Sequence, residues 1–438
     1  MRKVTVFRRF LPAFTIVVLS GMVFCGCGKK EKESIHLSMW APERKVTIVE
    51  NAMKEFKKLH EDEVDIEFNV SKQEEDECKN TILGNVKGAA DIFCFIDDQF
   101  DDLYEAGVLL DMTSYTDKSA DDFLAPVGGE NSRAGEVVMR DGKVYGYPEV
   151  SGNCPFLYYN KKYFSEKDVM SIDGIIDVCE KNNKKFSMDL GSGWYLYTFF
   201  KGAGLDIGKN ATTGKNECNW NATDTEHTGV SVVSSIMEMA RGRGFVDLND
   251  EDFVKKIKEK EVIAGVNGAW NADKIKEAWG DDMCATKLPT YTLGKDQVQM
   301  CSFIGYKAVG ISANTKHPEW CMKFLEYCMT PEKQIEEFRV GGEAPANLEA
   351  IESEEVKKST IVSAIAEQSK YGYTQRVADP FWDASHKLGV IISSKNKDYK
   401  NIQKNILTLI QITHILYHFT ALKSIVFYSI ALNIFYKF

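Results

Sequence analysis

The stretch Ala90–Met112, ADIFCFIDDQFDDLYEAGVLLDM, carries the pattern from which the fold of this chain can be predicted. It opens with the apolar run Ile92–Ile96, which has the length and composition of a strand buried on both faces of a parallel sheet. Apolar side chains then recur at helical spacing as far as Gly107, a residue type that commonly ends a helix. The stretch therefore predicts a buried strand that turns directly into a helix.

Two carboxylates, Asp97 and Asp98, lie between the predicted strand and the predicted helix. In open α/β sheets, ligands bind just outside the carboxyl ends of the strands, so this acidic corner is a candidate binding site. The alternative is that either aspartate caps the helix, since aspartate is a preferred N-cap residue. Both interpretations remain open from this stretch alone.

Strands and helices alternate on both sides of this stretch. Before it, the pattern predicts strands over 35–40 and 64–70 and helices over 49–59 and 74–83. After it, short strands are expected over 143–147, 156–159 and 185–190, and helices over 318–327, 331–338 and 380–392. Strand–helix repeats with short connections predict α/β domains that have a parallel sheet with helices on both faces.

The overall composition is that of a soluble globular protein. The chain has 438 residues, of which 44% are hydrophobic and 27% are charged, and this length suits two or three domains. The formal net charge is −10. Because nucleic-acid-binding proteins present a basic face, we expect no nucleic-acid partner.

Residues 1–26 have the organisation of a signal peptide. The segment holds four basic and no acidic residues, and its apolar run, Phe10–Phe24, is short for a membrane span. The pair Gly26–Cys27 resembles the lipobox of bacterial lipoproteins. By that resemblance Cys27 would be lipidated and become the mature N-terminus, and residues 27–34 would form a tether on the outer face of the cell membrane.

Motifs of metal centres and enzymes are missing from the sequence. Nine cysteines beyond the targeting region are scattered singly, without a C-x-x-C pair, so we expect no metal site and interpret most of them as small buried hydrophobes. The phosphate-loop, nucleophile-elbow and His-Glu-x-x-His patterns are also missing. We therefore expect no cofactor, no catalytic residue and no enzymatic activity, although a glycosidase pair of carboxylates stays open as an alternative.

Aromatic residues recur beside polar ones at the expected ends of strands and helices. Flat aromatic rings suit the apolar C–H faces of sugars, and carboxylates accept hydrogen bonds from sugar hydroxyl groups. The alternative is that these aromatic residues belong to the core, as most aromatic residues do. The residues concerned are Trp40, Phe95, Trp194, Tyr195, Trp270 and Trp382.

Five short motifs, in order along the chain, resemble the maltose/maltodextrin-binding branch of the family 1 extracellular solute-binding proteins, which are receptors of ATP-driven sugar importers. They are Asp91–Leu110, Gly142–Pro148, Tyr159–Lys161, Gly268–Trp270 and Phe381–Trp382. The resemblance extends from Ile35 to about Lys404. It implies a two-lobed, periplasmic-binding-protein-like α/β fold in which discontinuous lobes meet at a hinge. The expected division is 35–147 with 303–350 for lobe 1, and 148–302 with 351–404 for lobe 2.

The resemblance also implies a sugar site between the lobes and a mechanism of hinge closure. The implied contacts are Trp40, Glu43, Arg44, Phe95, Asp98, Asn153, Trp194, Tyr195, Trp270 and Trp382, with Asp98 as an acceptor for sugar hydroxyl groups and Asp97 left as a helix cap. Expected partners are maltose or malto-oligosaccharides, the permease subunits of an ABC transporter, and the membrane through the lipid anchor. The protein is expected to be a monomer.

Two features depart from the family pattern. Phe95 stands where a tryptophan is common and Gln99 where a cation can occur, so another oligosaccharide or solute is the alternative ligand. The tail, 405–438, is apolar and atypical, whereas the family normally ends in a polar helix near residue 410. This tail is either a membrane-associating segment or the product of a frame change in the gene.

Overall fold

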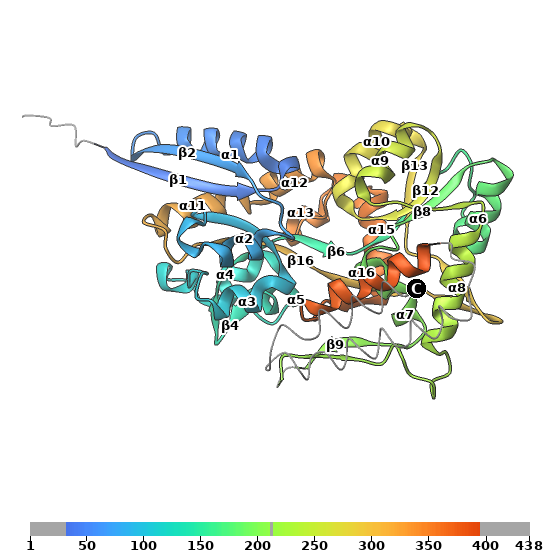
Figure 1. Ribbon diagram of the computed structural model, residues 1–438. Helices are drawn as coiled ribbons and strands as arrows, with labels where there is room; N and C mark the ends of the chain where they lie inside the picture. The colour runs from blue at the N-terminus through green and yellow to red at the C-terminus, as the bar shows by residue number, and fades with distance from the viewer. Residues whose placement is uncertain (1–31, 211–212, 395–438) are drawn as a thin grey trace, which may run out of the picture.

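Two separate sheets organise the protein, and each is the centre of one lobe (Figure 1). The computed structural model describes residues 32–210 and 213–394. Lobe 1 is built on a six-stranded sheet of order β17-β16-β3-β1-β2, with β6 also paired to β16. Lobe 2 is built on a five-stranded sheet of order β11-β8-β12-β7-β13. The predicted α/β class is confirmed.

The lobe 1 sheet begins with three parallel strands, β1 (Glu33–Ala41), β2 (Val64–Lys72) and β3 (Ile92–Ile96). β3 has the bounds that its apolar run predicts. β16 (Ser302–Ile311) pairs with β3 in the antiparallel direction, so the sheet is mixed rather than wholly parallel. β6 (Tyr147–Asn153) and β17 (Gly372–Thr374) pair with other parts of β16. The main helices of this lobe are α1 (Val46–Leu59), α2 (Cys78–Gly84), α3 (Phe100–Glu105), α11 (Pro318–Cys328) and α12 (Pro331–Gly341).

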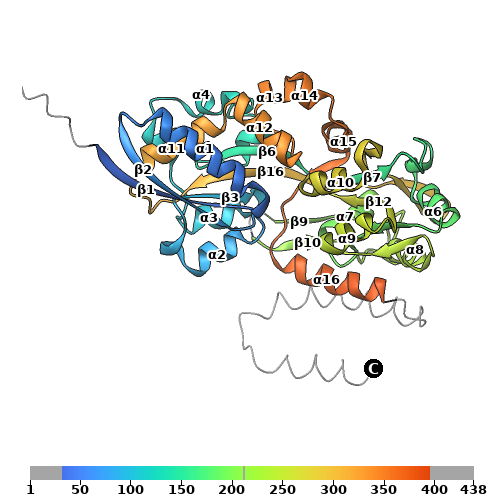
Figure 2. The same cartoon turned by 90° about the horizontal axis from the view of Figure 1, so that it is seen from above.

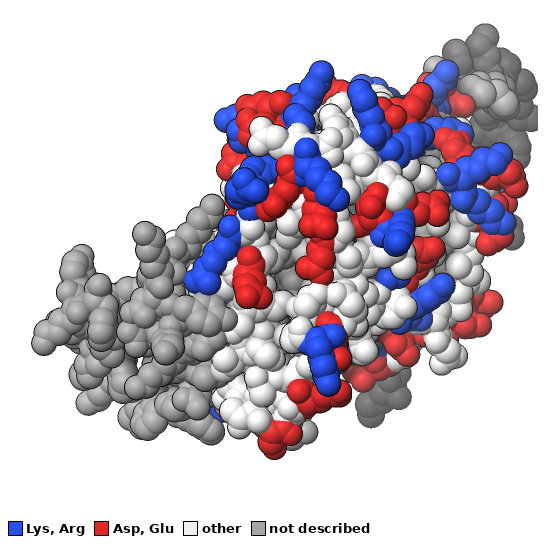
Figure 3. All heavy atoms as spheres, turned by 90° about the vertical axis from the view of Figure 1, so that its right-hand side faces the viewer, with Lys and Arg blue, Asp and Glu red and all other residues white. Residues whose placement is uncertain are grey.

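In the lobe 2 sheet, β8 (Lys185–Met188), β11 (Phe245–Asp247) and β12 (Val262–Asn267) are parallel. β7 (Phe156–Asn160) pairs with β12 in the antiparallel direction, and β13 (Met283–Thr286) pairs with β7 in the antiparallel direction. Its main helices are α6 (Ile172–Lys181), α7 (Gly193–Gly202), α8 (Gly229–Arg241), α9 (Asp250–Lys258), α10 (Ala272–Trp279), α15 (Thr360–Gln368) and α16 (Pro380–Ser393). On the face of lobe 2 seen in Figure 3, acidic and basic side chains are interspersed and form no large patch of one sign.

Each lobe has its own hydrophobic core. In lobe 1, Phe56 of α1 packs edge-on against Phe324 of α11, with ring centroids 5.4 Å apart. In lobe 2, Phe200 of α7 stacks on Trp220 at 3.9 Å. Burial of one such side chain stabilises the fold by about 1.5–3 kcal/mol, so each core holds its strand ends firmly in place.

The two lobes are joined by β6 and β16, which run between them in the middle of the molecule (Figure 2). A further link, which we call the crossing segment (372–379), includes β17 and leads into α16. The expected lobe boundaries at 147/148 and 302/303 fall inside β6 and β16, which are continuous strands. These boundaries therefore stay predictions.

Two other boundaries differ from those expected. β1 begins at Glu33, so it includes the last two residues of the segment expected to be a tether. α2 begins only at Cys78, and just before it the Gln99 side chain donates to the carbonyl groups of Glu75 and Asp76 and accepts the backbone N–H of Lys79. Residues 1–26, Cys27 and 405–438 lie outside the described residues. Within the described ranges, no helix is both long and apolar enough to cross a membrane.

Candidate functional site

The parallel strands of lobe 1 end at one edge of their sheet, and polar residues follow each of them. After β1 comes the short helix Glu43–Lys45, after β2 comes Glu75, and after β3 comes the pair Asp97–Asp98. The register places Ala41 of β1 beside Lys72 of β2. Polar side chains from three separate stretches of sequence are therefore gathered at this edge.

Lobe 2 presents a matching edge built from aromatic and polar residues. Trp194 lies on α7 after β8, Asp250 begins α9 after β11, and Trp270 lies in the turn after β12. The Trp270 indole N–H donates to Asp250 Oδ2 at 2.6 Å, which fixes the plane of the ring. The ring centroids of Trp194 and Trp270 are 5.5 Å apart, so the two indoles form one half-buried aromatic surface.

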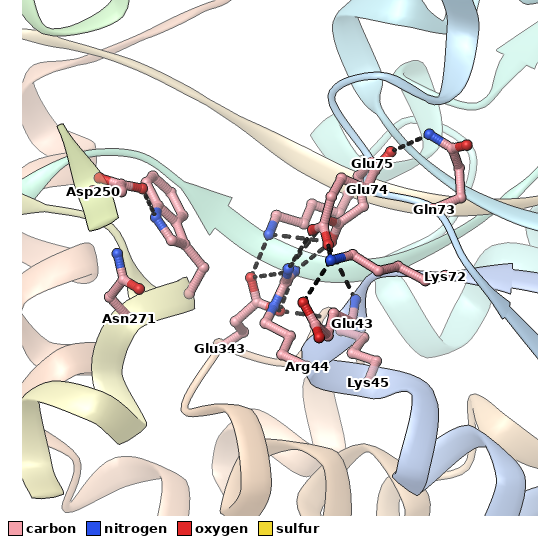
Figure 4. A network of polar contacts seen from close by, with 12 residues as sticks. Glu43, Arg44, Lys45, Lys72, Gln73, Glu74, Glu75, Asp250, Asn271 and Glu343 are labelled. Carbon is pink, nitrogen blue, oxygen red and sulfur yellow. Dashed lines mark hydrogen bonds and ion pairs between the residues drawn. The ribbon is translucent and has the colours of Figure 1, made fainter. Parts of the chain in front are cut away.

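A buried network of charges in lobe 1 stands opposite Asp250 and Asn271 of this lobe 2 edge (Figure 4). Arg44 donates to Glu75 at 3.2 Å and to Glu343, from the loop after α12, at 3.1 Å. Lys307 of β16 forms ion pairs with Glu343 and, at 3.4 Å, with Glu75. Figure 4 shows Asp250 and Asn271 of lobe 2 across from these groups.

The protonation states in the network follow from its geometry. Burial on its own would raise the pKa of Glu75, but the nearby Lys307 and Arg44 outweigh it and lower that pKa to about 2. Burial would also raise the pKa of Glu343, but Lys307 and Arg44 outweigh it and lower that pKa. The pKa of Arg44 is raised, because Glu343 and Glu75 outweigh its desolvation. Glu75, Glu343 and Arg44 are therefore ionised at neutral pH and provide fixed charges for polar recognition.

The two edges touch at two places. Lys307 Nζ lies 5.6 Å from the centre of the Trp270 ring, within the range of a cation–π contact. Gln375, in the crossing segment, accepts a hydrogen bond from the Trp194 indole at 3.0 Å and donates one to Asp98 Oδ2. Lobe 1 and lobe 2 are therefore linked directly at Lys307 and Trp270, and through the crossing segment at Gln375.

Asp97 and Asp98 occupy different environments in this arrangement. Burial raises the pKa of Asp98 to about 6, although the hydrogen bond from Gln375 opposes the rise. Burial raises the pKa of Asp97 further, to about 7, and Arg376, at 4.0 Å, opposes this only in part. Within the part of the chain that the structure describes, neither oxygen of Asp97 has a hydrogen-bond partner of normal geometry, and the same holds for Asp98 Oδ1.

Of the ten sugar contacts implied by the family resemblance, the structure brings five together: Arg44, Asp98, Trp194, Tyr195 and Trp270. Tyr195 is buried beside Trp194, and among residues 32–210 and 213–394 its hydroxyl has no hydrogen-bond partner of normal geometry. Four of the five remaining residues lie in other settings, and the fifth, Phe95, belongs to the lobe 1 core. Glu43 is exposed and pairs with Lys72, Trp40 packs on the lobe 1 core, Asn153 stands opposite Gly305 in the β6–β16 register, and Trp382 packs on Phe381.

Two expectations about this edge are wrong. Phe95 was expected to contact the ligand, but it is 0% exposed and packs between Phe93 and Phe100, because β3 is covered on both faces. Asp97 was expected to cap a helix, but no side-chain cap is present at Asp97–Gln99. Instead, Asp97 faces β16, where a Cβ added at Gly305 would lie 2.5 Å from its Oδ1.

Sequence reasoning missed Glu75, Asp250, Lys307, Glu343 and Gln375. For Glu75 and Asp250 a signal was available, because each follows a strand as Asp97 and Asp98 do. Lys307 is the lone charge in the apolar strand Ser302–Ile311, which is unusual for a residue that is not paired. No local pattern marks Glu343 or Gln375, whose partners lie far away in the sequence.

The site combines aromatic faces with fixed carboxylates, cations and an amide at facing edges of two lobes. This architecture defines a two-lobed binding protein. A family model described as bacterial extracellular solute-binding protein matches residues 51–364. The chain belongs to this family, and the resemblance expected from its motifs is confirmed.

Two curated relatives come from Bacillus subtilis (strain 168). The maltodextrin-binding protein MdxE is 27% identical over 300 residues, which cover 65% of this chain and 67% of that protein. A galactooligosaccharide-binding protein is 23% identical over 386 residues, which cover 82% of this chain and 85% of the relative.

Solved structures confirm the two-lobed fold. A structure described as a complex with acarbose has 26% identity and a TM-score of 0.73, and the match covers 86% of this chain and 98% of that one. The Thermus thermophilus maltotriose-binding protein, bound with maltotriose, has 18% identity and a TM-score of 0.70, with 85% and 98% covered. At this lower identity the likeness shows the fold alone.

Proposed function

We propose that this protein is the exported, lipid-anchored receptor of an ATP-driven sugar importer and that it binds malto-oligosaccharides in a cleft between its lobes. The observation that carries the proposal is the paired indole surface of Trp194 and Trp270, where Lys307 of the buried charge network of lobe 1 lies 5.6 Å from the centre of the Trp270 ring. The aromatic surface suits the C–H faces of glucose units, and the opposite edge suits their hydroxyl groups. The relative named as maltodextrin-binding supports this choice of sugar.

The proposed mechanism is closure of the two lobes around the hinge formed by β6, β16 and the crossing segment. A ligand shifts a conformational equilibrium only through its different affinity for the two states, so contacts from both lobes are required. Asp98 and Arg44 provide them from lobe 1, and Trp194 and Trp270 from lobe 2. The closed form would then present both lobes to the permease subunits, with the protein acting as a monomer.

Calorimetry and thermal unfolding with maltotriose test the proposal. Binding that raises the melting temperature and leaves the sugar intact supports a receptor. Cleaved sugar, seen by chromatography, would favour a secreted glycosidase instead. No heat of binding and no thermal shift with any malto-oligosaccharide would rule out the proposed ligand.

A second candidate ligand is a galacto-oligosaccharide, because one relative of similar length is named for binding such sugars. A panel of malto- and galacto-oligosaccharides of equal chain length distinguishes the two. The ligand that gives the larger rise in melting temperature at equal concentration is the better candidate.

Membrane anchoring through Cys27 is tested separately in cells. Metabolic labelling with a fatty acid and fractionation should place the full chain in the membrane fraction. The Cys27→Ser variant should lose both the label and the membrane association. An unlabelled wild-type protein would contradict the proposed anchor without affecting the proposed ligand.

A further inference from the structure

Gln375 lies where lobe 1, lobe 2 and the crossing segment meet, and its side chain is 7% exposed. Its Oε1 accepts the indole N–H of Trp194 at 3.0 Å. Its Nε2 donates to Oδ2 of Asp98. One amide thus contacts both the aromatic surface and the carboxylate at the end of β3.

The two partners of this amide determine its orientation. An indole nitrogen only donates, and an ionised carboxylate only accepts, so Oε1 must face Trp194 and Nε2 must face Asp98. A flipped amide would lose both hydrogen bonds. Gln375 therefore holds Trp194 and Asp98 in a fixed relation to each other.

The backbone around Gln375 is itself held in place. The carbonyl of Arg376 accepts from the backbone N–H of Lys209 at 2.7 Å. Ala378 exchanges two hydrogen bonds with the Asn216 side chain, at 2.6 and 3.0 Å. On the other side, Arg133 of lobe 1 donates to Thr374 Oγ1 at 2.9 Å. The amide of Gln375 is thus presented from a fixed segment.

Asp98 has one oxygen that accepts a hydrogen bond and one that does not. Oδ2 accepts from Gln375, whereas Oδ1 is buried and has no hydrogen-bond partner among the described residues. A buried acceptor without a donor is costly, and a ligand hydroxyl would satisfy it. The hydrogen bond to Oδ2 decides the direction in which Oδ1 points.

We infer that Gln375 is a positioning residue of the sugar site, which orients Asp98 so that Oδ1 accepts a ligand hydroxyl and holds the Trp194 ring beside it. This inference rests on the proposed function and assigns a role to a residue outside the sequence motifs. Gln375 acts through Trp194 and Asp98, so its contribution to sugar affinity must depend on these two residues.

The main test is calorimetry with maltotriose on Gln375→Met, which keeps the length of the side chain and removes both hydrogen bonds. Loss of orientation at a charged acceptor should weaken affinity by about tenfold. In an Asp98→Asn background the same substitution should cost less than about threefold, because residues that act together are not additive. An equal loss in both backgrounds would show a merely structural role and overturn the inference.

Two further variants complete the test. Trp194→Phe keeps an aromatic ring and removes the donor to Gln375 together with part of the aromatic face. It tests the second partner if Gln375→Met fails to fold, and a weakening of at least about threefold is expected. Gln368→Met is the matched control, because Gln368 is a buried glutamine that bonds Ser302 and Leu288 instead. It should lower the melting temperature and leave affinity unchanged.

The outcomes separate the inference from the proposed function. If the wild-type protein binds maltotriose and both Gln375→Met and Trp194→Phe bind it equally well, the inference alone is wrong. If the wild-type protein binds no sugar of the malto- and galacto-oligosaccharide panel, the proposed function fails and the inference fails with it.

Discussion

Lys307 Nζ stands 5.6 Å from the centre of the Trp270 ring, so the buried charges of lobe 1 are in contact with the aromatic surface of lobe 2. Lys307 is only 4% exposed and is already paired with Glu343 and Glu75. A cation held by two carboxylates is a fixed support for the ring rather than a mobile side chain. Trp270 is thus positioned by Lys307 and by its hydrogen bond to Asp250.

Replacing Trp270 by alanine should weaken maltotriose binding by tenfold or more. The substitution removes a stacking face whose loss costs on the order of 1.5 kcal/mol or more, and about 1.4 kcal/mol corresponds to a factor of ten. Calorimetry on Trp270→Ala measures this directly. Trp320→Ala is the matched control, because Trp320 is also half-buried with a lysine, Lys323, at 4.2 Å over its ring, but lies on α11. Equal losses for the two variants would contradict the assignment.

Replacing Lys307 by methionine should destabilise the fold. The variant leaves Glu75 and Glu343 buried with one cation fewer, and breaking a buried ion pair typically costs about 3–5 kcal/mol. Urea unfolding measures the change in the free energy of unfolding. Adding Glu343→Gln removes one uncompensated charge, so the double variant should be more stable than Lys307→Met alone. A double variant less stable than either single one would contradict this account.

The bounds of β3 could be predicted to the residue, because an apolar run closed by Asp91 and Asp97 leaves little freedom of choice. Strand-end reasoning marked Asp98, Trp194 and Trp270 only as candidates, and the family resemblance implied that they face each other across two lobes. The expectation for Asp97 failed, because its neighbour Gly305 is more than 200 residues away in the sequence. No local spacing indicates which distant strand covers a carboxylate.

Phe95 and Gln375 show two further limits of sequence reasoning. An aromatic residue near a strand end has the same local pattern whether it faces a ligand or the core, and only the packing of β16 on β3 decides for Phe95. Gln375 lies in a stretch without periodicity, and its partners are 277 and 181 residues away. Its role depends on tertiary contacts alone.

Because Phe95 belongs to the core, Phe95→Leu should lower stability and leave sugar affinity unchanged. The residue is fully buried between Phe93 and Phe100, and loss of ring volume in such a place costs about 1–3 kcal/mol. Denaturant unfolding and calorimetry with maltotriose are compared on the same protein sample. A loss of affinity without a loss of stability would restore the original expectation that Phe95 contacts the ligand.

Asp97 should make the protein less stable as the pH rises from about 4 to about 7. Its pKa is raised to about 7 in the folded protein by burial, which Arg376 offsets only in part, and the ordinary value is 3.8. Between these values the folded state holds a proton that the unfolded state has released, so the free energy of unfolding falls with increasing pH. Below pH 4 both states are protonated, and the contribution of Asp97 is constant.

The variant Asp97→Asn removes this titration and tests its sign. One pKa unit corresponds to about 1.4 kcal/mol, so the asparagine variant should gain up to about 4 kcal/mol relative to the wild type between pH 4 and pH 8. Glu337, whose pKa is also raised, titrates in the same direction in both proteins and cancels in the comparison. The charge of Asp98 helps to raise the pKa of Asp97, so relief of this repulsion is part of the expected gain. Urea unfolding at several pH values measures the difference, and the exposed Asp117→Asn serves as control. A difference between Asp97→Asn and wild type that stays constant across this range would show that Asp97 does not change its charge there.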